Sequence, residues 1–140
     1  MGRVATWDDV SRLACALPEV LEATDTNGLK WEVRRRYFVW ERPLRKRDLE
    51  ELGDAAPDGP ILGAMVADLN EKRGLIGSNP MVFFTVPHFA TYPAVLVLLD
   101  HVSLEQLEEV ITDAWLVRAP KRLAAEYLAS TSLPDLSGRG

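Results

Sequence analysis

Apolar residues recur at helical spacing in several segments of the chain. In residues 6–17, apolar side chains at positions 10, 13, 14 and 17 follow the i, i+3, i+4, i+7 pattern of a helix with one buried face. Thr6 stands at the N-cap position and Asp9 follows three residues later, which is the spacing of a capping box. Similar patterns predict helices over residues 46–52, 68–76, 103–115 and 120–129.

Other segments follow the pattern of strands. Residues 29–33 alternate apolar and polar side chains, and residues 37–40 are rich in the aromatic and β-branched types that favour strands. Together they predict a β-hairpin with its turn at Arg34 to Arg36. This turn contains no Gly or Asn, so its type is left open. Further strands are predicted within residues 60–67, 81–86 and 94–99.

This order of elements defines the expected fold class. Strands joined by short connections favour antiparallel pairing, so we expect an α+β fold with a mainly antiparallel sheet covered by helices on one face. A chain of 140 residues is the size of one ordinary domain. The sequence therefore predicts a single domain over residues 1–130 and a flexible C-terminal tail over residues 131–140, where Ser, Gly and Pro are frequent.

The composition favours a cytoplasmic protein. The longest apolar run, residues 94–99, is far shorter than the ~20 residues that a membrane-spanning helix needs. The first residues lack the apolar segment of a secretory signal. Cys15 is the single cysteine and cannot form an internal disulfide, which agrees with a reducing compartment. We therefore expect no membrane partner.

Charge is unevenly distributed along the chain. The net charge is −5, but residues 30–47 hold eight basic and two acidic residues, which leaves a net −11 on the remainder. A hairpin tip would carry arginines away from an acidic body, and arginine is well suited to bidentate phosphate contacts. The leading hypothesis is therefore DNA binding, with these phosphate contacts: Arg34, Arg35, Arg36, Arg42, Arg45, Lys46 and Arg47.

Two other interpretations of the basic segment remain open. The cluster is also compatible with a protein-interaction module that meets an acidic partner. Alternatively, its charges are simply solvated or paired with nearby carboxylates such as Asp48, Glu50 and Glu51. An acidic isoelectric point near 5.0 weakens the DNA hypothesis, because the body of the protein would repel nucleic acid outside the patch.

The sequence shows no catalytic constellation. Nucleophilic catalysis needs a nucleophile held beside a base, yet the chain has only two histidines and no G-x-S-x-G motif. No C-x-x-C, H-x-x-x-H or D-x-D-x-D-G pattern is present either, so we expect a non-enzymatic domain without metal or cofactor. The alternative binding site is a small-molecule or peptide pocket at the proline-framed loop 87–93, with these candidate residues: His88, Tyr92, Trp115 and Lys121.

Several phrases of the sequence resemble the MmcQ/YjbR family. They are "LPEV" at residues 17–20, "NGLKWEVRRRYFVW" at 27–40, "VFFTVPHFATYPAVLV" at 82–97 and "DAWLVRAPKRLAAEYL" at 113–128. The resemblance covers about residues 5–130 and implies a frataxin-like fold and DNA binding through a double-wing motif. It implies no catalytic residues. Iron binding is not carried over from frataxin, since the first helix has only Asp8 and Asp9 in place of a dense acidic ridge.

The chain departs from the family pattern at the hairpin. Arg34 to Arg36 stand where the resemblance leads one to expect a turn that contains glycine. A second, smaller basic group consists of Arg118, Lys121 and Arg122 in the family's "AW…APKR" segment. We expect this group to adjoin the hairpin tip.

Overall fold

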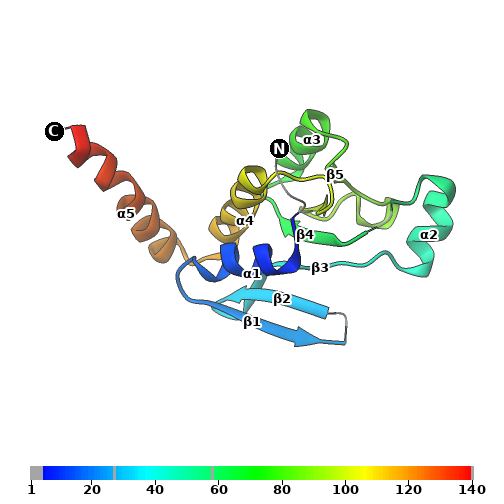
Figure 1. The fold of residues 1–140 in the computed structure, drawn as a ribbon, viewed down its shortest axis with the longest axis horizontal. Helices are drawn as coiled ribbons and strands as arrows, with labels where there is room; N and C mark the ends of the chain where they lie inside the picture. Colours follow the sequence, from blue (N-terminus) through cyan, green and yellow to red (C-terminus); the bar gives the residue numbers. More distant parts are fainter. Residues whose placement is uncertain (1–4, 27, 58, 140) are drawn as a thin grey trace.

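The computed structural model describes residues 5–26, 28–57 and 59–139, and its side chains up to Ser130 except that of His88. Its elements are α1 (Trp7–Cys15), β1 (Val20–Asp25), β2 (Gly28–Val33), β3 (Arg36–Glu41), α2 (Lys46–Leu52), β4 (Ile61–Met65), α3 (Leu69–Ser78), β5 (Phe83–Phe84), β6 (Ala94–Leu98), α4 (Leu104–Arg118) and α5 (Lys121–Arg139), with short 3₁₀ turns at Gly53–Ala55 and Pro87–Phe89 (Figure 1). The six strands form one sheet in the order β1-β2-β3-β4-β6-β5. Every described pairing is antiparallel, which confirms the predicted α+β class.

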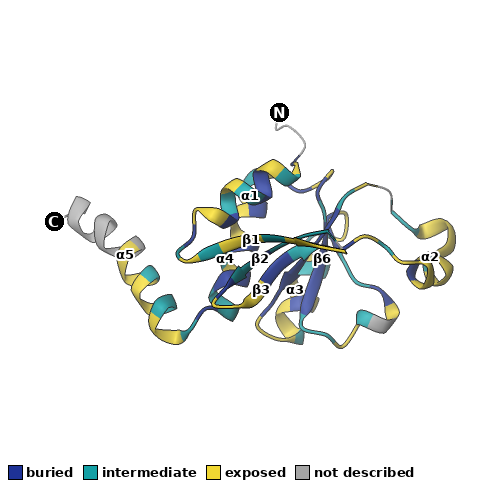
Figure 2. Cartoon of the chain, turned by 90° about the horizontal axis from the view of Figure 1, so that it is seen from below, coloured by how far each residue is buried: buried dark blue, intermediate teal, exposed yellow. Residues whose placement is uncertain are grey.

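The core lies between the sheet and a layer of helices. Helix α1 packs against β1, β2 and α4, and α4 packs against β3 and β4. The largest side chains buried there are Trp31, Phe38, Phe83 and Trp115. A smaller apolar cluster around Ile61, Val86 and Leu96 lies on the other face of β4 and β6, because neighbouring strand positions point to opposite faces. Strand β1 and helix α2 are mostly exposed (Figure 2).

Local capping explains where the main helices begin. The side chain of Thr6 accepts a hydrogen bond from the backbone N–H of Asp9 at 3.4 Å, and the Asp9 carboxylate accepts one from the Thr6 N–H at 2.9 Å. Ser103 caps α4 in the same position by accepting from the N–H of Gln106 at 3.1 Å. These contacts satisfy backbone donors that a helix end leaves free. The predicted helix over residues 46–52 also coincides with α2.

The sequence pattern missed β1. This strand lies at the edge of the sheet and pairs only with β2, and its Leu21 is 70% exposed. An edge strand with little buried surface does not need a regular alternation of apolar side chains. β1 therefore leaves a weak signal in the sequence, although it extends the predicted hairpin to a three-stranded unit.

Two predicted segments have different lengths in the structure. The strand expected over residues 81–86 is confined to Phe83–Phe84. Helix α5 continues to Arg139, beyond the end near residue 129 that the sequence indicates, while the flexibility of residues 131–140 stays a prediction. Within the described residues, none of the helices is both long enough and apolar enough to cross a membrane.

Candidate nucleic-acid interface

The hairpin tip is a two-residue turn made of arginines. Val33 pairs with Arg36, so Arg34 and Arg35 alone connect β2 to β3. Their φ angles are 51° and 70°, and positive φ at both central residues is the requirement of a type I′ turn. Asn-Gly is the favoured pair for such a turn, because other side chains crowd the backbone in the left-handed region. Backbone strain of this kind concentrates at functional sites.

Glu19 holds one of the two turn residues. The Arg34 guanidinium donates from Nε and Nη2 to the Glu19 carboxylate, and the second of these contacts measures 3.1 Å. The hydrogen bond from Arg34 lowers the pKa of the Glu19 carboxyl below its ordinary value. Glu19 itself has a φ of 58°. Arg34 therefore serves mainly to fix the turn, since its charge is matched by a carboxylate.

Replacing Arg34 by Asn and Arg35 by Gly should stabilise the fold. Removing the backbone strain at each of the two left-handed residues stabilises the fold by about 1–2 kcal/mol. Glycine offsets part of this gain, because it increases the conformational entropy of the unfolded chain. The exposed ion pair that is lost contributes little in solvent. We expect a net gain of about 1 kcal/mol, which a thermal melt would record as a rise of about 3–4 °C in Tm. An unchanged or lower Tm would show that this turn is not strained.

Arg118 of the second basic group adjoins the hairpin tip. Arg36 donates from Nη1 to the backbone oxygen of Arg118 at 3.4 Å. Arg118 in turn donates from Nε to the backbone oxygen of Tyr37 at 3.2 Å, and its guanidinium lies 5.9 Å from the centre of the Tyr37 ring. Helix α5 begins three residues after Arg118. We call the resulting cluster the basic end; it consists of Arg34, Arg35, Arg36, Arg118, Lys121 and Arg122.

Two carboxylates reduce the charge of the basic end. Glu19 pairs with Arg34, and Glu126 lies 3.8 Å from Arg122 on the exposed side of α5. Within the described residues, no ion pair to a carboxylate engages the other four members of the basic end, Arg35, Arg36, Arg118 and Lys121. About four charges are therefore available for a polyanion.

The remaining basic residues lie at the opposite end of β3. Arg45 precedes α2, and Lys46 and Arg47 are its first residues. The six residues of β3 separate this group from the hairpin tip by about 20 Å. Figure 1 shows the β2–β3 turn beside the start of α5, with α2 at the far side of the molecule. Carboxylates are interleaved at α2, where Glu51 lies 3.9 Å from Arg47. The predicted basic residues thus form two separate groups and not one continuous surface.

Arg42 does not fit the predicted role of a phosphate contact. It is only 5% exposed, and its Nη1 lies 3.1 Å from Oδ2 of Asp48, which is fully buried. The same nitrogen donates to the Pro43 backbone oxygen at 2.6 Å, and the guanidinium lies 5.5 Å from the centre of the Phe89 ring. Arg42 therefore fastens the segment between β3 and α2. The sequence could not reveal this, because nothing in the local pattern distinguishes an arginine whose side chain points into the protein from its exposed neighbours.

The candidate pocket residues have different environments. Trp115 is completely buried, donates from Nε1 to the Pro18 backbone oxygen at 3.1 Å and packs edge-on against Tyr127, so it is a core residue. Tyr92 is half-buried, and burial and a hydrogen bond with Tyr37 raise its pKa. Lys121 is exposed and belongs to the basic end. The side chain of His88 lies outside the described residues.

A buried lysine that sequence analysis missed fixes the loop of that predicted pocket. Lys72 of α3 is 2% exposed, and its Nζ donates to the backbone oxygens of Phe89, Ala90 and Tyr92 at 2.7, 3.3 and 2.8 Å. Burial lowers the pKa of its ammonium group. In the sequence Lys72 stands among polar residues of a helix, so no local signal distinguishes it from a solvated lysine. Within the described residues, no group of three or more His, Cys, Asp or Glu side chains is placed to hold a metal ion.

Comparison with known proteins relates this fold to a family. No family model matches the chain. The uncharacterised proteins Rv2570 of Mycobacterium tuberculosis and Mb2600 of Mycobacterium bovis are each 47% identical to it over 131 residues, which cover 91% of this chain and 99% of theirs. The chain belongs to the same family as these mycobacterial proteins.

A solved structure has a fold similar to that of this chain. It is the crystal structure of the Deinococcus radiodurans protein DR2400, described as a DUF419 domain, with a TM-score of 0.60. The match covers 81% of this chain and 78% of that chain at 23% sequence identity. At this identity the likeness shows the shared fold and does not extend to a ligand.

Proposed function

We propose that the chain is a non-enzymatic domain of the MmcQ/YjbR type that binds DNA phosphates through the basic end. The observation that carries this proposal is the arginine turn, whose unfavourable backbone places Arg35 next to Arg36, and Arg36 in turn donates to the backbone oxygen of Arg118. A turn of Asn-Gly would satisfy the same backbone at lower cost. Arg34 is paired with Glu19, so it is the charge of Arg35 that supplies something other than stability.

The geometry at the basic end suits phosphate groups. Arg36 and Arg118 are partly ordered before any ligand arrives, because each donates to a backbone oxygen and still has further N–H groups. Such preorganisation lowers the entropy lost on binding. The acidic remainder of the protein would repel a polyanion, so contacts should be confined to this end. We therefore expect few phosphate contacts and a strongly salt-dependent affinity.

A salt titration with a labelled DNA duplex tests the proposal. Four available charges predict a slope of about −3 to −4 for the logarithm of the binding constant against the logarithm of the salt concentration, from about 0.9 per phosphate contact. Changing Arg34, Arg35 and Arg36 together to Gln should reduce the slope to about −2, because Arg118 and Lys121 remain. Fluorescence anisotropy at several salt concentrations would measure both slopes.

The chain provides a matched control at α2. Changing Arg45, Lys46 and Arg47 together to Gln removes the same charge at the opposite end of β3 and should leave the slope nearly unchanged. Equal losses in the two variants would indicate general electrostatic attraction and contradict a defined interface. The absence of duplex binding at low salt would end the proposal. Arg34→Asn with Arg35→Gly should weaken binding while raising Tm, which would separate function from stability.

A further inference from the structure

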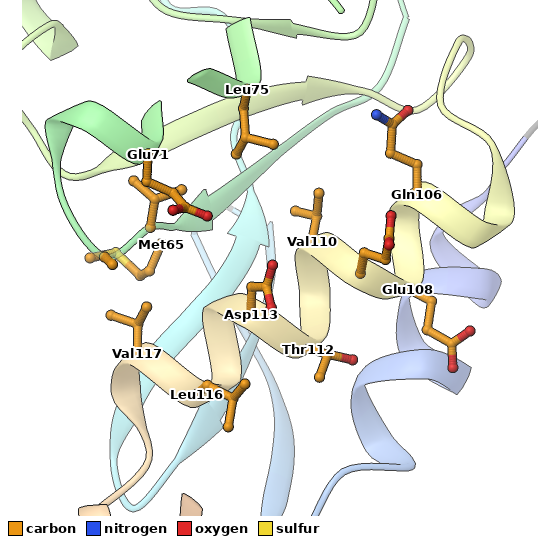
Figure 3. Close-up of a pocket in the computed structure, with 13 residues that line it drawn as sticks. Met65, Glu71, Leu75, Gln106, Glu108, Val110, Thr112, Asp113, Leu116 and Val117 are labelled. Atoms are coloured by element: carbon orange, nitrogen blue, oxygen red, sulfur yellow. The ribbon is translucent and has the colours of Figure 1, made fainter. Parts of the chain in front are cut away.

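A groove of about 760 Å³ lies between α3 and α4 and is outside the proposed function. Arg118 of the basic end borders it at one end, where its Nη2 lies 3.5 Å from Sδ of Met65. Figure 3 shows Leu75 and Glu71 of α3 facing Val110 and Asp113 of α4 across it, with Met65 at the end of β4 nearby. The lining is largely apolar, and its size falls in the range of binding sites in proteins. Its apolar residues are Met65, Val66, Ala67, Leu75, Val110, Leu116 and Val117.

Carboxylates border this apolar surface. Glu71, Glu108, Glu109 and Asp113 all line the groove and are exposed, and its described lining contains no Lys or Arg. Partial burial, together with the nearby charges of Glu71 and Glu109, raises the pKa of Asp113. The carboxylates therefore repel one another, and none of the described residues that line the groove carries a positive charge. They are not gathered tightly enough to hold a metal ion, so they suit an extended cationic ligand better than a single ion.

The length of the groove indicates the shape of this ligand. Six of the eight lining residues of α4, at positions 106, 109, 110, 113, 116 and 117, recur at helical spacing, so one face of the helix forms most of the wall. From Gln106 to Val117 this wall is about 16 Å long, at 1.5 Å per residue, which equals about three helical turns. A helix laid in a groove uses apolar anchors at the same spacing.

We propose that this groove docks a cationic amphipathic helix of a partner protein. Leucine-like side chains on one face of that helix would pack against Leu75, Val110 and Leu116. Lysines or arginines flanking this face would meet Glu71, Glu109 and Asp113. Charge complementarity selects this occupant, because a nucleic acid or an acidic segment would be repelled by the same rim.

A model peptide provides the test. The probe is a synthetic helix of about 12 residues, or three to four turns, with Leu on one face and Lys on both sides of it. Fluorescence anisotropy of the labelled peptide with the full chain should show saturable binding, and circular dichroism should show that the peptide becomes more helical. A scrambled peptide of the same composition and a peptide with Glu in place of Lys should bind much more weakly.

Two charge-matched variants locate the binding site. Changing Glu71 and Glu109 to Gln and Asp113 to Asn should weaken binding about tenfold, since each exposed ion pair contributes roughly a factor of two. Changing Glu50 and Glu51 of α2 to Gln and Asp54 of the following 3₁₀ turn to Asn removes the same charge and should have little effect. Equal effects of the two triple variants, or equal binding of the scrambled peptide, would overturn the proposal.

A further pair of variants tests the apolar floor and the identity of the occupant. Leu116→Gln should weaken binding of the peptide, whereas Leu128→Gln, at an exposed leucine of α5, should not. Thermal melts of both variants would verify that they fold. Sedimentation of the full chain should show a monomer. Self-association that the groove triple variant abolishes would identify a second copy as the occupant and overturn the proposal of a partner helix.

Discussion

Asp48→Ala is expected to destabilise the protein by about 3–5 kcal/mol, because it leaves the buried charge of Arg42 without its carboxylate. The pair is strongly desolvated, with Asp48 fully buried and Arg42 5% exposed. Asp48 also accepts a hydrogen bond from the backbone N–H of Arg45 at 2.9 Å, so the same change removes a cap from the start of α2. Denaturant unfolding at neutral pH would measure the loss as a lower midpoint.

A double variant isolates the cause of this loss. Replacing Arg42 by Met and Asp48 by Leu removes both charges and keeps the volume apolar, and such replacements are often close to neutral. Most of the lost stability should therefore return. If the double variant is as unstable as Asp48→Ala, the cap and the packing of α2 outweigh the loss of the carboxylate that faces Arg42. An unfolding midpoint of Asp48→Ala close to that of the wild type would contradict the assigned ion pair.

Lys72→Met is expected to destabilise the protein by about 2–4 kcal/mol. The variant keeps the length of the side chain but removes a charged donor from three backbone oxygens of the loop 87–93. The oxygens of Phe89 and Tyr92 each keep a backbone N–H donor, so the loss comes mainly from the charged hydrogen bonds, which contribute about 1.5–3 kcal/mol each. Hydrogen exchange or limited proteolysis should report greater opening of this loop. Arg73→Met is the matched control on the same helix, since Arg73 is exposed, and should change stability by less than about 0.5 kcal/mol.

The pH dependence of the same variant has a defined sign. Burial lowers the pKa of Lys72 in the folded protein, so the unfolded chain binds more protons at this site. The stability that Lys72 contributes should therefore rise with pH between its folded pKa and the unfolded value of about 10.4. The difference in unfolding free energy between the wild type and Lys72→Met should grow across this window. A difference that shrinks as the pH rises would contradict the burial of the ammonium group.

The sequence by itself determined the local elements and the fold class. The capping box at Thr6 marked the start of α1, and the alternation of residues 29–33 revealed the central hairpin. These signals are readable because a helix start and a strand face each depend on residues only a few positions apart. The pattern failed at β1, where an exposed edge strand needs little apolar alternation.

The sequence also located the excess of basic residues, but it did not show that these residues form two separate groups in space. Eight cations within residues 30–47 appear as one patch along the chain. Only the tertiary structure separates them, because β3 is extended and carries the second group about 20 Å from the first. Packing of α4 against β3 also brings the hairpin tip to Arg118, which lies more than 80 positions away in the sequence.

Burial decided the roles of the remaining charged residues. Arg42 and Lys72 are indistinguishable from solvated cations in the sequence. In the structure both side chains point into the protein, and each donates hydrogen bonds to buried oxygen atoms. The carboxylates of α4 appear in the sequence as an ordinary solvated helix face, and they border a groove only because α3 packs beside them. Local patterns encode periodicity and caps, whereas the environment of a charge depends on which distant segments fold against it.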